Sequence, residues 1–131
     1  MARARTTSRM EKNIEIHNTT IAGSTRTEIS WQLDGGEVEA QVKRIMLSLG
    51  TTLNCPASFK LGLFQFQPTT ADFDNDEAIV LSGALNGQFV HNETITMRVP
   101  KDYHLAIQIM NWHPSSQDVT WNCQCNYKVL N

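Results

Sequence analysis

Residues 119–131 read VTWNCQCNYKVLN, and apolar and polar side chains alternate along this stretch without a break. Successive side chains of a β-strand point to opposite faces of its sheet, so the alternation predicts a strand with one apolar and one polar face. The apolar face would carry Val119, Trp121, Cys123, Cys125, Tyr127 and Val129, and the polar face Thr120, Asn122, Gln124, Asn126 and Lys128. We expect the apolar face to lie against a hydrophobic core.

The two cysteines of this strand share its apolar face. Cys123 and Cys125 are about 6.5 to 7 Å apart along the strand, which is too far for a disulfide bond between them. A zinc site would require Cys55 and one of the four histidines to converge on them, and no CxxC or HxxxH spacing prepares such a site. We therefore expect buried, reduced cysteines without a metal ion. An odd number of cysteines, three, also fits a reducing compartment better than a secreted disulfide scaffold.

Six other segments are predicted to be strands. They are NIEIHNTTI (13–21), TEISWQL (27–33), SFKLGLFQFQ (58–67), AIVLSGAL (78–85), ETITMRVP (93–100) and YHLAIQIMNW (103–112). Alternation in three of them predicts the inward residues Ile29, Trp31, Leu33, Ile95, Met97, Val99, Leu105, Ile107 and Ile109.

One further segment, DGGEVEAQVKRIMLSLG, allows two interpretations. Asp34 and Glu37 have the spacing of a helix capping box, apolar residues follow at helical intervals, and a glycine would end the helix. Alternatively, the apolar residues alternate on one face with a phase shift at Lys43 and Arg44, as a β-bulge produces. We favour a bulged strand over a helix at 37–49, because the strand signals on both sides need a pairing partner.

The number of strands defines the expected fold class. With the segment at 37–49, about eight strands fall in a chain of 131 residues, a length that favours one domain. We predict an all-β protein with an antiparallel two-sheet sandwich, jelly-roll-like, formed by residues 13–131 as a single domain. Charged residues make up only 18% of the chain, and uncharged polar residues suit the exposed faces of strands.

Residues 1–12 differ from the rest of the chain in composition. They carry the cations Arg3, Arg5, Arg9 and Lys12 against one acid, whereas the whole chain has a net charge of −2. Such a segment cannot bury enough apolar surface to order itself, so we predict a short, flexible basic N-terminal arm. It lacks the apolar core of a secretory signal peptide, and no run of 18 or more apolar residues predicts a membrane span.

The sequence carries no complete motif for catalysis. The segment ADFDNDEA groups four acids but lacks the glycine and the last glutamate of a calcium loop, so we expect an exposed acidic loop between two strands. No Ser–His–Asp or Cys–His arrangement and no glycine-rich phosphate loop can be read from the spacing. We therefore expect no catalytic residues, no cofactor and no enzymatic activity.

The chain contains three long blocks of strand pattern, VKRIMLSLGTTLNCPASFKLGLFQFQ, ITMRVPKDYHLAIQIMNW and VTWNCQCNYKVL. These blocks resemble those of small viral capsid and capsid-decorating proteins with a jelly-roll or β-sandwich fold, and the resemblance covers residues 13–131. It implies a virion structural protein that acts by self-assembly, as a homo-oligomer or with other capsid proteins. It also implies that the protein is located in the virion and made in the cytoplasm or nucleus of a host cell.

In such a protein the arm would contact a neighbouring subunit or, weakly, nucleic acid, through Arg3, Arg5, Arg9 and Lys12. The arm is shorter and less dense than the arginine arms of many coat proteins that package nucleic acid. The sequence therefore leaves genome binding open.

The alternative function is that of a carbohydrate-binding β-sandwich module used for attachment. Sugars stack on exposed Trp or Tyr rings, and Asn and Asp side chains supply hydrogen bonds. The candidate glycan patch at a predicted strand end is Asn111, Trp112 and His113.

Overall fold

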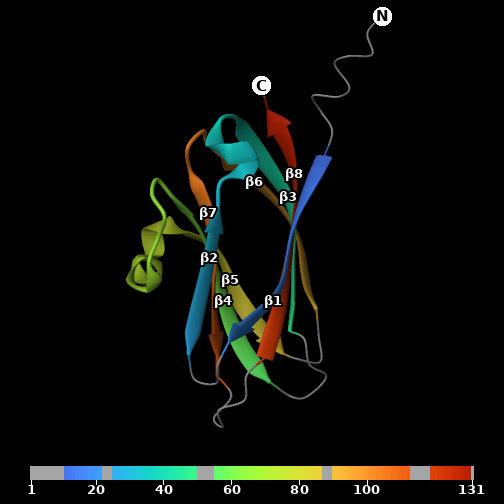
Figure 1. The fold of residues 1–131 in the computed structure, drawn as a ribbon, viewed down its shortest axis with the longest axis vertical. Helices are drawn as coiled ribbons and strands as arrows, with labels where there is room; N and C mark the ends of the chain where they lie inside the picture. Colours follow the sequence, from blue (N-terminus) through green and yellow to red (C-terminus); the bar gives the residue numbers. More distant parts are fainter. Residues whose placement is uncertain (1–10, 22–24, 50–54, 87–89, 113–118, 131) are drawn as a thin grey trace, which may run out of the picture.

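The computed structural model describes residues 11–21, 25–49, 55–86, 90–112 and 119–130, and in them the protein is a sandwich of two four-stranded antiparallel sheets (Figure 1). The strands are β1 (Glu11–Ile21), β2 (Arg26–Trp31), β3 (Glu39–Leu49), β4 (Pro56–Phe64), β5 (Ile79–Asn86), β6 (His91–Val99), β7 (His104–Asn111) and β8 (Val119–Leu130). Three short 3₁₀ turns lie between strands: η1 (Leu33–Gly36), η2 (Thr70–Asp74) and η3 (Asp76–Ala78). No helix of the described part has the length and apolar character needed to cross a membrane.

The strand order is that of a jelly roll. The first sheet has the order β1-β8-β3-β6 and the second β2-β7-β4-β5. Strand β1 pairs with β8, β2 with β7, β3 with β6 and β4 with β5, as in one long ribbon doubled back between β4 and β5. Rolling this ribbon places β8 beside β3 and β7 beside β4. The predicted all-β, two-sheet, jelly-roll-like fold of about eight strands is thus confirmed.

Strand β8 supplies much of the core of the first sheet. Its inward side chains Trp121, Cys123, Cys125 and Tyr127 are all buried, whereas the residues between them are only half-buried. They pack with inward residues of both sheets into one cluster that includes Ile45, whose strand neighbours β8. The inward face predicted from the alternation in the sequence is confirmed at these positions.

Strand β3 settles the choice between helix and strand at 37–49. Residues 39–49 form a bulged strand, with a shift of register between Val42 and Arg44. Val42 and Ile45 are both fully buried although they are three positions apart, because Lys43 and Arg44 occupy the bulge between them. The predicted phase shift is therefore confirmed. The capping-box interpretation was wrong: Asp34 lies in η1 with a φ of 51°, outside any α-helix.

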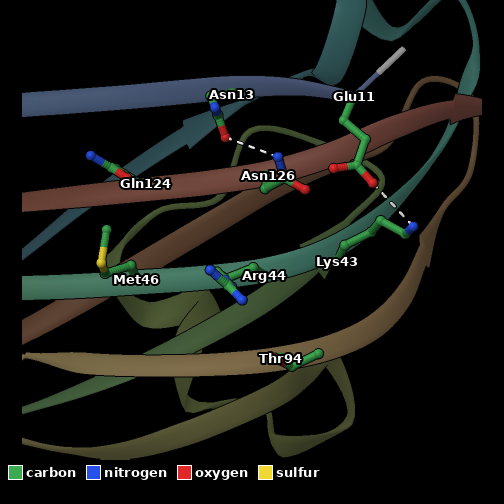
Figure 2. Close-up of a pocket in the computed structure, with 8 residues that line it drawn as sticks. All are labelled: Glu11, Asn13, Lys43, Arg44, Met46, Thr94, Gln124 and Asn126. Atoms are coloured by element: carbon green, nitrogen blue, oxygen red, sulfur yellow. Dashed lines mark hydrogen bonds and ion pairs between the residues drawn. The ribbon is translucent and has the colours of Figure 1, made fainter. Parts of the chain in front are cut away.

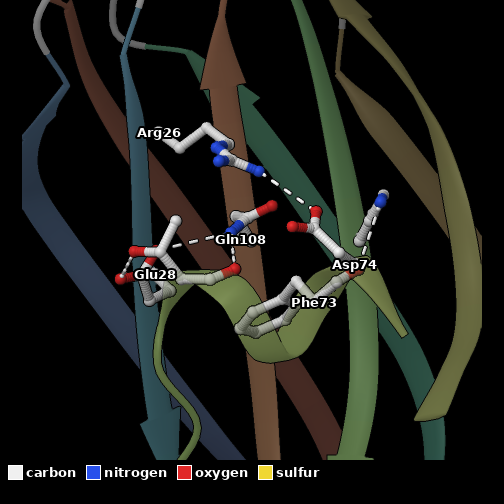
Figure 3. Close-up of polar contacts among 7 residues, drawn as sticks. Arg26, Glu28, Phe73, Asp74 and Gln108 are labelled. Carbon is white, nitrogen blue, oxygen red and sulfur yellow. Dashed lines mark hydrogen bonds and ion pairs between the residues drawn. The ribbon is translucent and has the colours of Figure 1, made fainter. Parts of the chain in front are cut away.

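The connection between β4 and β5 covers part of the outer face of the second sheet (Figure 1, left). Phe73 of this connection is fully buried against Phe64 and Ala106. Gln108, on the outer face of β7, is only 4% exposed, and its side-chain amide donates to the Thr70 carbonyl at 3.1 Å (Figure 3). Strand β7 is consequently buried on both faces, which explains its nearly continuous apolar sequence.

The predicted acidic loop is part of this connection. Arg26 on β2 pairs with Asp74 (Nη1 to Oδ1, 3.3 Å), whose side chain is 61% exposed, and Gln108 also donates to Glu28 (Figure 3). Asp74, Asp76 and Glu77 are exposed between two strands, as expected, and Asp74 helps to hold the connection against the sheet. Asp72 is half-buried and accepts hydrogen bonds from Thr69 at the start of η2.

Replacing Trp121 by alanine tests the inward face of β8. Trp121 is fully buried, and removing a core aromatic side chain typically costs about 3 to 5 kcal/mol. We expect Trp121→Ala to lower the free energy of unfolding by this amount in urea titrations. Trp121→Phe should lose clearly less, because the indole N–H of Trp121 has no hydrogen-bond partner among the described residues. Trp112→Ala, at an exposed tryptophan, is the control and should cost about 1 kcal/mol. Equal losses at positions 121 and 112 would contradict the assignment.

Candidate interaction surfaces

The first candidate surface is the basic segment at the N-terminus. Strand β1 begins at Glu11, whose backbone and that of Lys12 pair with Lys128 and Tyr127 of β8. These two residues are therefore part of the sheet, although their composition placed them in the arm predicted at residues 1–12. Arg3, Arg5 and Arg9 lie outside the described residues.

Lys12 is already engaged within the molecule. Its Nζ atom lies 2.7 Å from Oδ2 of Asp34, and Oδ1 of Asp34 accepts a hydrogen bond from the Tyr127 hydroxyl, also at 2.7 Å. The bonds from Lys12 and Tyr127 hold the pKa of the Asp34 carboxyl below its usual value, whereas burial and the neighbouring carboxylate raise the pKa of Tyr127. Lys12 thus links the first strand to η1 and β8.

The second candidate surface is the predicted glycan patch, which the structure divides. Asn111 is 1% exposed and accepts a contact from the Cys55 thiol at 3.5 Å. It cannot contact a sugar, because it lies on the inner face of β7, in line with Leu105, Ile107 and Ile109 of the core. Trp112 is 55% exposed, and its indole N–H donates to Ser58 Oγ at 2.8 Å. His113 lies outside the described residues.

A shallow groove of about 390 Å³ lies beside Trp112. Its other lining residues are Arg26, Ser58, Phe59, Lys60, Gln108 and Met110. The groove combines an exposed aromatic ring with two cations and a hydroxyl. Arg26 and Lys60 line this groove together with Trp112. The sequence did not predict this grouping, because the two cations come from two other strands.

The third candidate surface is the outer face of the first sheet. Exposed or half-buried residues on it are mostly uncharged and polar, and they surround an open hollow of about 520 Å³ (Figure 2). The hollow is lined by Glu11, Asn13, Lys43, Arg44, Met46, Thr94, Gln124 and Asn126. An ion pair joins Lys43 Nζ to Glu11 Oε2 at 3.1 Å, and the Asn126 amide donates to Asn13 at 3.1 Å.

The bulge in β3 accounts for the position of this hollow. Two residues of β3, Lys43 and Arg44, separate the inward Val42 and Ile45. The corresponding part of β8 has one residue, Asn126, and that of β6 has three, residues 94–96. The strands therefore spread from β8 towards β6 at this point. Arg44 lies at the bulge, is exposed, and makes no hydrogen bond or ion pair with the described residues.

The cysteines do not form a reactive site in the structure. Cys55, Cys123 and Cys125 are buried as free thiols, as expected from the sequence. Burial raises the pKa of Cys123 and of Cys125 to about 12, so the thiolate form is scarce at neutral pH. In the described ranges of the chain, no group of three or more His, Cys, Asp or Glu residues is arranged to hold a metal ion.

Comparison with known proteins identifies the fold through structure alone. No protein-family model and no curated protein matches the sequence. The structure of tomato aspermy virus matches with a TM-score of 0.52 and 7% identity, over 95% of this chain and 79% of that one. An empty particle of Kashmir bee virus matches with a TM-score of 0.52 and 12% identity, over 98% of this chain and 80% of that one. A mitogen from Yersinia pseudotuberculosis gives a TM-score of 0.49 at 11% identity, over 89% and 85% of the two chains.

These comparisons define the class of fold to which the chain belongs. It shares, over nearly its whole length, the β-sandwich fold of viral capsid structures. At 7 and 12% identity, the likeness establishes the fold, and the resemblance inferred from the strand blocks of the sequence is confirmed at that level.

The ion pair at Asp34 predicts a dependence of stability on pH. The carboxyl has a lower pKa in the folded than in the unfolded chain, so its contribution is present above the unfolded value of about 3.9 and is lost as the pH falls through the folded value. Asp34→Asn should therefore be less stable than the wild type near pH 7, and the two should converge in acid. Asparagine also tolerates the left-handed backbone at this position.

Urea unfolding at a series of pH values measures this convergence. Asp102→Asn is the matched control, because Asp102 also has a positive φ, of 69°, and its exposed side chain lies outside this cluster. We expect the Asp102 variant to follow the wild type at every pH. If the free energies of unfolding of the wild type and Asp34→Asn change in parallel with pH, the charge of Asp34 and its bonds to Lys12 and Tyr127 do not contribute to stability.

Proposed function

We propose that the protein is a virion structural protein, a capsid subunit or a shell-decorating component that acts by assembling with copies of itself or with other shell proteins. The observation that supports this most directly is the near-complete overlap of the chain with two viral capsid structures. Its working location would be the virion, after synthesis in the cytoplasm or nucleus of a host cell.

The surfaces of the sandwich are consistent with this role. The large side chains of the core are enclosed between the sheets, while the outer face of the first sheet is a broad field of neutral polar groups. Such groups form hydrogen bonds across wet interfaces and do not repel identical neighbours, as like charges do. Arg44, at the edge of the hollow, offers an uncompensated cation to an acidic group of a neighbouring subunit.

We infer a separate role for the segment before β1. Arg3, Arg5 and Arg9 would contact packaged nucleic acid or an adjacent subunit, whereas Lys12 is paired with Asp34. Three cations bind a polyanion only weakly in one copy, but many copies in a closed shell strengthen the contact through avidity.

Assembly of the purified protein tests both parts of the proposal. We expect particles or closed oligomers in light scattering and negative-stain electron microscopy. A variant lacking residues 1–10 should keep its melting temperature, because it retains all of β1 from Glu11 to Ile21 and its pairing with β8. It should retain less nucleic acid at low salt, and the logarithmic slope of retention against salt should be shallower by about 2 to 3.

Arg3, Arg5 and Arg9 replaced together by glutamine in the full chain provide the matched control for charge. This variant should reproduce the deletion in nucleic-acid retention. A wild-type protein that remains a monomer at all concentrations and with nucleic acid present would contradict the shell role. Retention identical to that of the wild type at every salt concentration would contradict the role of the arginines alone.

Glycan attachment is a second candidate function, supported by the exposed ring of Trp112 beside the groove with Arg26 and Lys60. If it holds, a glycan array should yield a ligand whose affinity falls at least about fivefold in Trp112→Ala, since a stacked ring contributes about 1 kcal/mol or more. Phe66→Ala, at another exposed aromatic residue, is the control and should bind normally. Equal effects of the two variants would exclude the groove.

A further inference from the structure

One edge of the second sheet is open to another strand. Strand β5 pairs with β4 along one side, and no strand of the described part pairs along its other side. An unpaired edge presents a row of backbone N–H and C=O groups that a further strand can bind. Proteins commonly block such edges with charged residues or proline. The sequence of β5, IVLSGALN, contains neither. An irregularity lies at the start of β5, where its register with β4 shifts between Leu81 and Ile79, and residues 81–86 are paired regularly.

The other edge strands of the described part differ from β5 in this respect. Each of them carries charged residues, namely Glu11 and Lys12 on β1, Arg26 and Glu28 on β2, and Glu93 and Arg98 on β6. Strand β5 is therefore the edge at which a second β-strand meets no fixed charge.

Exposed apolar groups gather at the same edge. Val80 on β5 is 44% exposed, and Val90, just before β6, is 58% exposed. Val90 lies with Ala84 and Leu85 in an open hollow of about 480 Å³ at the end of β5. Exposed apolar groups beside a neutral edge are a feature of interaction sites.

The order of residues along β5 is self-complementary. In an antiparallel pair related by a two-fold axis at Ser82, Val80 lies opposite Ala84 and Leu81 opposite Gly83 of the second copy. Each larger side chain then meets a smaller one. The side chains of Ser82 and Ala84 are exposed on the outer face, and Val80, also exposed, lies at the point where the register of β5 with β4 shifts. The pairing buries no charge.

We propose that β5 pairs antiparallel with β5 of a second copy about a two-fold axis at Ser82, joining the second sheets of two subunits into one continuous sheet. The inference names one contact of the proposed assembly and rests on that proposal for its biological setting. A single strand pair buries less than the roughly 1,200 Å² of a stable interface, so the isolated dimer is expected to be weak and to be strengthened in the assembled shell.

Disulfide trapping tests the pairing and its register. Opposite residues of an antiparallel pair have Cα atoms about 4.5 to 5.5 Å apart, within the range that a disulfide bond spans. Under mild oxidation, Ser82→Cys should therefore form a covalent dimer. Val80→Cys or Ala84→Cys alone should not, because position 80 meets 84, but a mixture of these two variants should cross-link. The wild type is the control, since its cysteines are buried.

Introducing a charge provides an independent test. Ser82→Lys places two ammonium groups opposite each other at the axis and should raise the dissociation constant of the dimer about fivefold in sedimentation equilibrium. Thr96→Lys, at an exposed position on the β6 edge of the other sheet, should leave the dissociation constant within about twofold. Urea unfolding verifies that both variants fold.

The outcomes distinguish this contact from the shell role. Absence of cross-links in Ser82→Cys and in the mixture, or equal cross-linking of every variant, overturns the β5 pairing, as does an unchanged dimer in Ser82→Lys. If the wild type forms particles in that case, the shell role stands without this contact. Specific cross-links in a protein that never forms particles would instead support the pairing and contradict the shell role.

Discussion

The fold depends on one strand, β8, that is paired along both edges while its inner face is buried. Its partners are β1 and β3, so the last strand of the described chain lies between the first and third. Trp121 on its inner face is fully enclosed by the two sheets. Because backbone groups at such a depth need partners, β8 can occupy this position only when both neighbours are in register. The alternation of apolar and polar residues along it fixes that register, since a shift by one residue would turn Trp121 to solvent.

The bulge in β3 allows this strand to pair with β8 on one side and with β6 on the other while its apolar residues stay in the core. Val42 and Ile45 both face the core, and the two residues between them meet one residue of β8 and a longer stretch of β6. The core remains continuous across the bulge, while the outer face spreads and forms the polar hollow around Arg44. The bulge therefore keeps Val42 and Ile45 in the core and also shapes the hollow on the outer surface. In this way the packing of the core determines the form of a surface that a neighbouring molecule could contact.

Structural features that depend on a single strand were predictable from local patterns in the sequence. Alternation identified the inward residues of β8, and the phase shift at Lys43 and Arg44 identified the bulge. Features that depend on distant pairing were not predictable in this way. Asn111 looked like a surface residue at a strand end, but it continues the inward face of Leu105, Ile107 and Ile109 on β7 and is buried against Cys55. Asp34 had the spacing of a helix cap, whereas its actual partners, Lys12 and Tyr127, come from strands that meet only in the folded sheet.

The topology also bears on the order in which surfaces form. Strands β4 and β5 are joined by residues 65–78, whereas β1 and β8 lie at opposite ends of the chain. Closing a longer loop costs more conformational entropy, and distant contacts cannot contribute until it is closed, so β4 and β5 are positioned to pair early and β8 to be inserted late. During that interval the neutral outer edge of β5 already exists, while the core that β8 completes does not. A sandwich that leaves such an edge uncharged risks premature association before its core is complete.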